Sequence, residues 1–397
     1  MSKRIALTGL GLGAFALILF LAGIENSPSP IFDESSYVIG ARSLLSGAQD
    51  LNPEHPPLAK FLIAGGMRLS GDNPFGWRLA GAALGALTLI AIFLWTYLLL
   101  RDYTLALTAA GLTLFNNFLF VMSRVAMLDV FYFAFVMWGV LAFSAAILLD
   151  LSLARRRVLL GASGLLFGLG AACKWNALVS LGAIGLVAAV LYVRNSHRLR
   201  EVGVTTLGVA LIFVPVAAYV LAYWPLCHRF HRPFTFTELA EMNAFIWRYH
   251  VNCPGNPALD VRWYRWFFRA SPERALSYLM GNFVVVWGGL LALLICGWRF
   301  LRSFPLAEGL VTLLYTSNLL QWVVIPQKRL VYYYYFPPAM FLGVAIVIVL
   351  ARARSQRLFG IRLTLLLLLA SGIFFLYCYP RMAGLQSPYD CMFGCWS

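Results

Sequence analysis

Residues 5–23 read IALTGLGLGAFALILFLAG, a stretch without a charged side chain. At about 1.5 Å of rise per residue, a helix of that length is long enough to cross the hydrocarbon core of a bilayer. Two adjacent carboxylates, Asp33 and Glu34, follow within ten residues of its end. Because an ionised carboxylate loses hydration close to hydrocarbon, an acidic pair at such a boundary is more often functional than incidental. We therefore predict a membrane-spanning helix that is followed by an acidic functional site.

The composition is that of a membrane protein. Hydrophobic residues make up 61% of the chain and charged residues 12%, whereas a soluble domain is roughly a quarter charged. The apolar runs are too long and continuous for the strands of a barrel, so we predict an all-α multi-pass membrane protein. We expect about eleven transmembrane helices, at residues 5–23, 78–100, 104–120, 127–149, 158–172, 177–193, 203–224, 281–298, 306–325, 331–351 and 363–380.

The distribution of the net charge of +15 predicts the topology. Arginine-rich short loops alternate along the chain, and the positive-inside rule makes their side cytoplasmic, together with the N-terminus. Two long loops, residues 24–77 and 225–280, then lie on the extracytoplasmic side of the plasma (inner) membrane. No linker or convincing repeat divides the chain, so we expect one transmembrane domain over residues 1–397. The aromatic-rich second loop has two open interpretations, an aromatic belt at the membrane surface and an acceptor-binding segment.

The first long loop contains a second candidate motif after the acidic pair. Residues 35–45 and 58–69 have amphipathic spacing, and we expect two helices that lie at the membrane interface. Between them, His55 and Lys60 flank two consecutive prolines, which fix the backbone and present both side chains close to the same surface. A phosphate-bearing ligand is a candidate partner for these cations.

Further charged residues fall at the predicted outer ends of spans. Arg78 is a candidate phosphate ligand, although snorkelling to the interface is a common role for such an arginine. Asp129 lies near membrane depth and needs a cationic partner, for which Arg124, Lys60 and Lys174 are candidates. Two more cations in a short outer loop are a further candidate anion contact, Lys328 and Arg329.

One reaction fits a carboxylate and several cations beside lipid. Asp33 or Glu34 would take the proton of an acceptor hydroxyl while the cations stabilise a departing lipid phosphate. Adjacent side chains point in different directions, so only one is expected to reach the hydroxyl, and the other would bind the sugar or a neighbouring cation. Cationic side chains suffice for a monophosphate, so we expect no required cofactor. A divalent metal stays open, with Asp33, Glu34 and Asp129 as the residues that would have to converge.

The ordered motifs resemble a known family. They are Phe32-Asp33-Glu34, His55-Pro56-Pro57-Leu58-Ala59-Lys60, Arg78, Ser123-Arg124 with Leu128-Asp129, Gly168-Leu169 with Lys174-Trp175-Asn176, and Tyr333-Tyr334-Tyr335-Phe336-Pro337. In this order they resemble the dolichyl-phosphate-mannose–protein mannosyltransferases of the GT-C superfamily of polyprenyl-phosphate-sugar glycosyltransferases. Residues 242–250 and 263–266 of the second long loop also follow that family's pattern. The resemblance covers roughly residues 30–340, without the large soluble insertion of the eukaryotic enzymes.

The resemblance implies a fold, a reaction and residue roles. It implies the GT-C fold and an inverting, extracytoplasmic transfer of mannose from a polyprenyl-phosphate donor to a protein Ser or Thr hydroxyl. Asp33 matches the proposed base, Glu34 its substrate-binding neighbour and Arg78 a residue assigned to the donor phosphate. The other matched residues line or support the site, namely His55, Lys60, Arg124, Asp129 and Lys174.

Two alternatives remain open. One is sugar transfer to a lipid acceptor, as in the transfer of aminoarabinose to lipid A. The other is a transporter or flippase for lipid-linked glycans. The absence of a sequence repeat, and charges that gather at one membrane face rather than at the midplane, favour an enzyme over a transporter.

Overall fold

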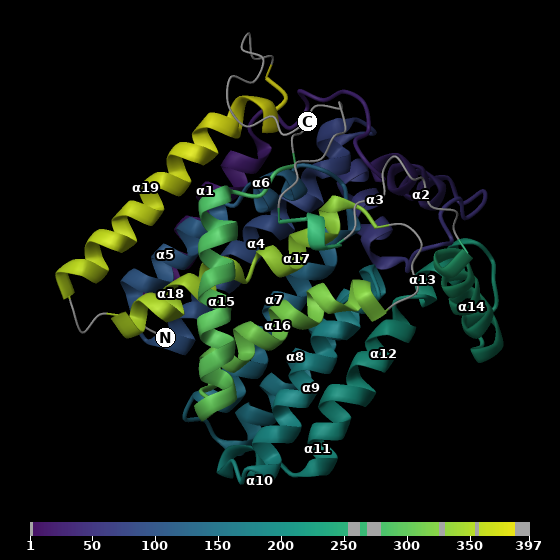
Figure 1. Ribbon diagram of the computed structural model, residues 1–397. Helices are drawn as coiled ribbons and strands as arrows, with labels where there is room; N and C mark the ends of the chain where they lie inside the picture. Colours follow the sequence, from purple (N-terminus) through teal and green to yellow (C-terminus); the bar gives the residue numbers. More distant parts are fainter. Residues whose placement is uncertain (1–2, 253–262, 268–278, 325–329, 354–356, 386–397) are drawn as a thin grey trace. The chain divides into compact units, whose positions relative to one another are not determined.

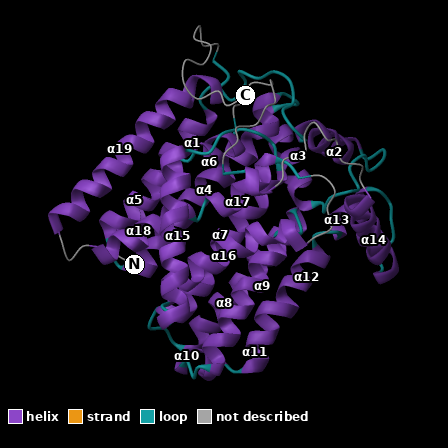
Figure 2. Cartoon of the chain, viewed as in Figure 1, coloured by secondary structure: helices purple, strands orange, loops and turns teal. Residues whose placement is uncertain are grey.

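The computed structural model describes residues 3–252, 263–267, 279–324, 330–353 and 357–385. These residues form helices and loops and contain no strand (Figure 2). The predicted all-α class is confirmed. The helices labelled in Figure 1, with the short ones between them, are α1 (Lys3–Leu21), α2 (Glu34–Ser46), α3 (Leu58–Ser70), α4 (Pro74–Leu100), α5 (Tyr103–Leu114), α6 (Asn117–Ser123), α7 (Leu128–Leu148), α8 (Leu153–Cys173), α9 (Ala177–Val193), α10 (His197–Val202), α11 (Val204–Gly208), the π-helix η1 (Val209–Phe213), α12 (Val214–Leu221), α13 (Trp224–Arg229), α14 (Phe236–Asn252), the 3₁₀-helix η2 (Trp263–Arg265), α15 (Phe283–Ser303), α16 (Leu306–Val324), the 3₁₀-helix η3 (Tyr332–Tyr335), α17 (Phe336–Ala339), α18 (Leu342–Ala353) and α19 (Arg357–Met382).

Within these described ranges, eight helical segments are long and apolar enough to cross a membrane, or nine if the bent pair α5 and α6 is one span. The expected number of about eleven is therefore not confirmed. The predicted span at 104–120 is broken by a bend of 62° between α5 and α6. Helix α9 has only 17 residues, and α16 contains Glu308, Asn318 and Gln321, which lower its hydropathy. The two helices expected in the first long loop are present as α2 and α3.

The chain divides into two compact units. The first unit is Met1–Ile31, Gly81–Val125 and Pro254–Ser397, and the second unit is Phe32–Ala80 and Ala126–Cys253. The second unit contains most of the residues that the sequence singled out. The single domain expected over residues 1–397 stays a prediction.

Close helix packing in the second unit depends on two glycines of α8. A Cβ atom at Gly164 would overlap the carbonyl oxygen of Ala210, and one at Gly168 would overlap that of Pro215. Small residues four apart therefore let η1 and α12 approach the backbone of α8. The same helix packs along α7 on another side. This packing fixes the end of α8, where Lys174 follows.

The predicted loop helices α2 and α3 pack against each other in the second unit (Figure 1). Helix α2 ends at Gly47, whose φ of 74° is left-handed and suits glycine. A Cβ atom there would lie 2.7 Å from the guanidinium carbon of Arg229. Arg229 donates to the carbonyl oxygens of Leu44 and Leu45, which are otherwise orphaned at the end of the helix. Helix α13 is thereby attached to α2.

Candidate functional site

The acidic pair lies at the start of α2 in the second unit. Phe32 has a φ of 53°, which is unusual for a bulky residue and turns the chain into the helix. Asp33 occupies the N-cap position, but its side chain does not cap the helix. Its carbonyl oxygen accepts the first hydrogen bonds of α2, from the backbone N–H groups of Ser36 and Tyr37. Asp33 is partly exposed, whereas Glu34 is fully buried.

Glu34 is bound on both oxygens. Arg78 Nε donates to Glu34 Oε1 at 2.9 Å, and Arg78 Nη2 donates to Oε2 at 2.8 Å. The backbone N–H of Ala126 also donates to Oε1, at 2.8 Å. The Arg78 side chain is only 1% exposed, so this is a buried, bidentate ion pair. Of the two roles left open for the second carboxylate, the structure assigns binding of a neighbouring cation to Glu34.

A second buried ion pair joins α7 to the end of α8. Lys174 Nζ lies 2.9 Å from Asp129 Oδ1 and 2.8 Å from Oδ2. Asp129 stands in the first turn of α7, and Lys174 directly follows the last residue of α8. Of the three candidate cations for Asp129, Lys174 is therefore the partner.

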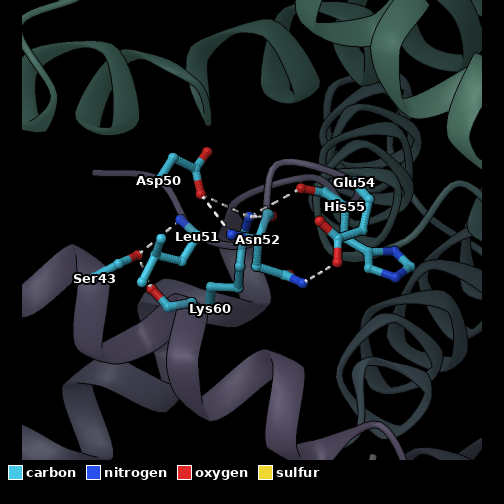
Figure 3. Close-up of polar contacts among 8 residues, drawn as sticks. Ser43, Asp50, Leu51, Asn52, Glu54, His55 and Lys60 are labelled. Carbon is cyan, nitrogen blue, oxygen red and sulfur yellow. Dashed lines mark hydrogen bonds and ion pairs between the residues drawn. The ribbon is translucent and has the colours of Figure 1, made fainter.

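Lys60 organises the loop that carries His55. Its ammonium group, on a side chain 1% exposed, donates to the carbonyl oxygens of Asn52 and His55 and lies 3.8 Å from Asp50 Oδ1. Figure 3 shows the Lys60 side chain rising from α3 into the turn formed by the loop. Within that turn, Asn52 Nδ2 donates to Glu54 Oε1 at 2.7 Å. The cation therefore satisfies backbone groups of the loop, and burial lowers the pKa of Lys60 while Asp50 and Glu54 raise it.

His55 meets a second histidine from α14. The ring of His55 lies edge-on to Tyr37 with centroids 5.3 Å apart, and 4.9 Å from the ring of His250. His250 Nε2 lies 3.1 Å from the carbonyl oxygen of Glu54. Desolvation by the surrounding protein lowers the pKa of both rings, and the positive charge of Lys174 lowers it further. Both histidines are therefore neutral at pH 7.

The negative charge of Asp33 opposes this effect at His250, where it raises the pKa. Asp33 and Lys174 therefore each lie within electrostatic reach of His250. The sequence motifs did not single out His250 as a site residue. His250 could have been found from the sequence, because it ends residues 242–250, one of the stretches that follow the family's pattern.

Arg124 is located in the first unit and has a structural contact there. Its Nη1 atom donates to the carbonyl oxygens of Phe20 and Ala22 at 2.8 and 2.5 Å, and Nη2 donates to that of Gly23 at 2.7 Å. These are the last carbonyl groups around the end of α1, so Arg124 caps that helix. The side chain is 6% exposed.

Two predicted phosphate ligands, Lys328 and Arg329, lie outside the described residues. Within the described part of the chain, no three carboxylate, histidine or cysteine side chains are close enough together to hold a metal ion. Glu34 and Asp129 pair with different cations, so the hypothesis that they converge with Asp33 on a metal receives no support.

Comparison with known proteins explains the order of these motifs. The family model described as dolichyl-phosphate-mannose-protein mannosyltransferase matches residues 54–223. A polyprenol-phosphate-mannose–protein mannosyltransferase of Mycobacterium tuberculosis is 29% identical over 245 residues, which cover 52% of this chain and 46% of the relative. The relative of that name in Mycolicibacterium smegmatis is 30% identical over 254 residues, with 54% and 48% covered. Over residues 54–223 the chain is similar to the dolichyl-phosphate-mannose–protein mannosyltransferase family. It spans about half the length of these curated relatives.

Solved structures with low sequence identity agree on the fold. The S. cerevisiae protein O-mannosyltransferase Pmt1-Pmt2 complex bound to the sugar donor matches with a TM-score of 0.84 at 15% identity, covering 97% of this chain and 91% of that chain. ArnT from Cupriavidus metallidurans bound to undecaprenyl phosphate matches with a TM-score of 0.60 at 17% identity, covering 91% and 63%. The predicted GT-C fold is thus confirmed, and the chain is a multi-pass membrane protein.

Proposed function

We propose that this protein transfers mannose from a polyprenyl-phosphate-linked donor to a Ser or Thr hydroxyl of a protein, with Asp33 as the catalytic base. The observation that carries the proposal is the placement of Asp33. It is partly exposed at the start of α2, directly before a carboxylate that is buried and locked by Arg78. The names of the mycobacterial relatives support mannose as the sugar, a polyprenol-phosphate carrier and a protein acceptor.

The proposed step is a single displacement. The Asp33 carboxylate takes the proton of the acceptor hydroxyl as its oxygen attacks the anomeric carbon of the sugar. The bond from that carbon to the phosphate oxygen breaks, and the lipid phosphate leaves with the electron pair. Attack opposite to the leaving group inverts the anomeric configuration.

Cationic side chains are proposed to stabilise the leaving phosphate. Lys174 is one candidate, because its charge and that of Asp33 both act on the pKa of His250. The contacts of Arg78 support a role in positioning Glu34, and the direct phosphate contact implied by the family resemblance stays a prediction, as it does for Lys328 and Arg329. The proposal invokes no metal ion, because side-chain cations provide the charge.

We further propose that the reaction takes place on the extracytoplasmic face of the inner membrane. The support is the alternation of arginine-rich short loops with the long loops that contain Asp33 and α14. Labelling of a single cysteine introduced at Ser35, which is exposed beside the acidic pair, tests this placement with a membrane-impermeant thiol reagent in intact cells. Labelling only after permeabilisation would contradict it.

The reaction itself is tested with purified protein, radiolabelled polyprenyl-phosphate-mannose and two acceptors, a Ser/Thr peptide and a lipid. We expect label on the peptide and a glycosidic linkage inverted relative to the donor. Label on the lipid alone would favour the alternative of a lipid acceptor. Retention of configuration would contradict the single displacement.

A further inference from the structure

A pocket of about 210 Å³ opens beside the histidine pair in the second unit. Three segments form it, namely the loop before α3, helix α13 with the residues on either side of it, and helix α14. The apolar part of its lining includes Tyr223, Met242, Phe245 and Ile246, and charged residues stand around it. Neither the Glu34–Arg78 pair nor the Asp129–Lys174 pair lines it.

We propose that this pocket binds the acceptor polypeptide, by taking an apolar side chain close to the Ser or Thr in a segment of neutral or basic character. This inference rests on the proposed function and adds to it the position and chemistry of the acceptor subsite. Pockets for whole small-molecule ligands generally measure about 300–1,000 Å³. The smaller volume here suits one or two side chains of a longer chain that continues outside.

The charges around the pocket favour a basic acceptor segment. Arg232 is paired with Glu238 at 2.5 Å, and Asp50 lies 3.8 Å from Lys60. Glu241 is exposed, and it has no ion pair among the described residues. The charge left unneutralised at the rim is therefore negative, which attracts Lys or Arg and repels a lipid phosphate.

Contacts connect the pocket to the proposed base. His55 lines the pocket, and its ring lies against that of Tyr37. Tyr37 stands one helical turn after Asp33, because its backbone N–H donates to the Asp33 carbonyl oxygen at 3.2 Å. An extended chain anchored in the pocket by one side chain therefore has its next residues near Asp33, at about 3.3 Å per residue.

Hydrogen bonds also hold α14 in a defined position. Trp175 Nε1 donates to the Tyr219 hydroxyl at 2.8 Å, and that hydroxyl donates to Asn243 Oδ1 at 2.5 Å. Trp175 directly follows Lys174, the partner of Asp129. The helix that lines the pocket is thereby tied to the segment that carries the second ion pair, so a bound acceptor would have a fixed register relative to the reacting groups.

The first test fills the pocket. Met242→Trp should raise the KM for the peptide by about tenfold or more while the KM for the donor stays unchanged. Ala244→Trp is the matched control, because Ala244 is exposed and lies two residues along α14, on its opposite face. An unchanged peptide KM in a folded Met242→Trp protein would overturn the proposal.

The second test changes the charge of the exposed Glu241 without adding bulk to the interior. Wild type should prefer a peptide with Lys next to the acceptor Ser over one with Glu, and Glu241→Lys should reverse that preference. An unchanged preference would overturn the proposal, whether or not Met242→Trp folds. If the wild type mannosylates peptides and both variants do so in the same way, the pocket assignment alone is overturned. Transfer only to the lipid would instead overturn the proposed function and with it the peptide subsite.

Discussion

Glu34 and Arg78 form a buried bidentate ion pair, in which Nε and Nη2 of the arginine lie 2.9 and 2.8 Å from the two carboxylate oxygens. Because Glu34 also accepts from the backbone N–H of Ala126, one side chain attaches the start of α2 to the start of α4 and to the segment before α7. The residue attached in this way is the direct neighbour of Asp33. Rigid support of this kind is what positions a reacting group within a fraction of an ångström.

Removal of one partner of this pair should destabilise the protein strongly. Glu34→Ala leaves the Arg78 guanidinium buried without its counter-ion, at a cost of about 3–5 kcal/mol in the free energy of unfolding. The measurement is thermal unfolding of purified protein in detergent. The double variant Glu34→Leu with Arg78→Met should recover much of the loss, since neither charge then remains buried.

The exposed pair Arg42–Asp72 provides the control for this measurement. Its side chains are 45% and 46% exposed, although its geometry is also bidentate. Arg42→Ala should therefore cost about 1 kcal/mol or less. Equal losses for Arg42→Ala and Glu34→Ala would show that burial is not what gives the Glu34 pair its strength.

Loss of one partner of the buried Asp129–Lys174 pair should also destabilise the protein, and it should lower the rate of transfer as well. Lys174→Met leaves Asp129 without its cation and removes the charge proposed to assist the leaving phosphate. Lys174→Met combined with Asp129→Asn should regain thermal stability but not the rate of transfer. Recovery of the rate together with the stability would indicate that Lys174 serves packing alone.

Lys60 should stabilise the loop that carries His55 and Asp50. Lys60→Met keeps the apolar stem but leaves the carbonyl oxygens of Asn52 and His55 without their donor, at about 1–3 kcal/mol for each buried group left unsatisfied. We expect faster hydrogen exchange of the loop and a raised KM for the peptide. Unchanged hydrogen exchange of the loop would show that water replaces the ammonium group without a loss of stability.

The two lowered histidine pKa values predict a loss of stability in mild acid. The unfolded chain takes up protons near the ordinary histidine pKa of 6.5, whereas folded His55 and His250 resist protonation. The unfolded state therefore binds more protons as the pH falls through 6.5, and the folded state loses stability in that window. Thermal unfolding at about pH 7.5 and about pH 5.5 measures this loss.

The matched variant for the acid effect is His55→Gln with His250→Gln. It removes both titrating rings and leaves the nearby cations Lys60 and Lys174 in place. Its melting temperature should fall less over the same pH range than that of the wild type. An equal fall in both proteins would assign the effect to groups other than these two histidines.

The sequence predicted the helical class and the similarity to known mannosyltransferases because both depend on patterns along the chain. Long uncharged runs specify membrane helices, and α2 and α3 follow from amphipathic spacing around two prolines. The number of spans was less predictable. The break between α5 and α6 depends on Asn116, whose side chain accepts from the N–H of Phe118 and donates to the carbonyl oxygen of Ala339, far along the chain.

The partner of each single cation also could not be predicted from the sequence. Charge and predicted membrane side made Lys60 and Arg78 candidates for a phosphate, and Arg124 a candidate partner of Asp129. In the structure they bind loop carbonyls, a carboxylate and the end of α1, respectively. The most distant of these partners, Phe20, is 104 residues from Arg124 along the chain. Only the packed chain therefore distinguishes an ion pair from a helix cap. For the same reason, the sequence could not identify Lys174 as the partner of Asp129, or His55 and His250 as neighbours.

The role of Asp33 as the base is tested by the rate of mannose transfer by Asp33→Asn, compared with Ser35→Asn as a control at an exposed neighbouring position. Purified variants should have the same melting temperature and the same affinity for polyprenyl-phosphate-mannose. Loss of a general base predicts a fall in kcat of about 10²–10⁴-fold for Asp33→Asn alone. Transfer at the wild-type rate by a correctly folded Asp33→Asn protein would show that Asp33 is not the catalytic base.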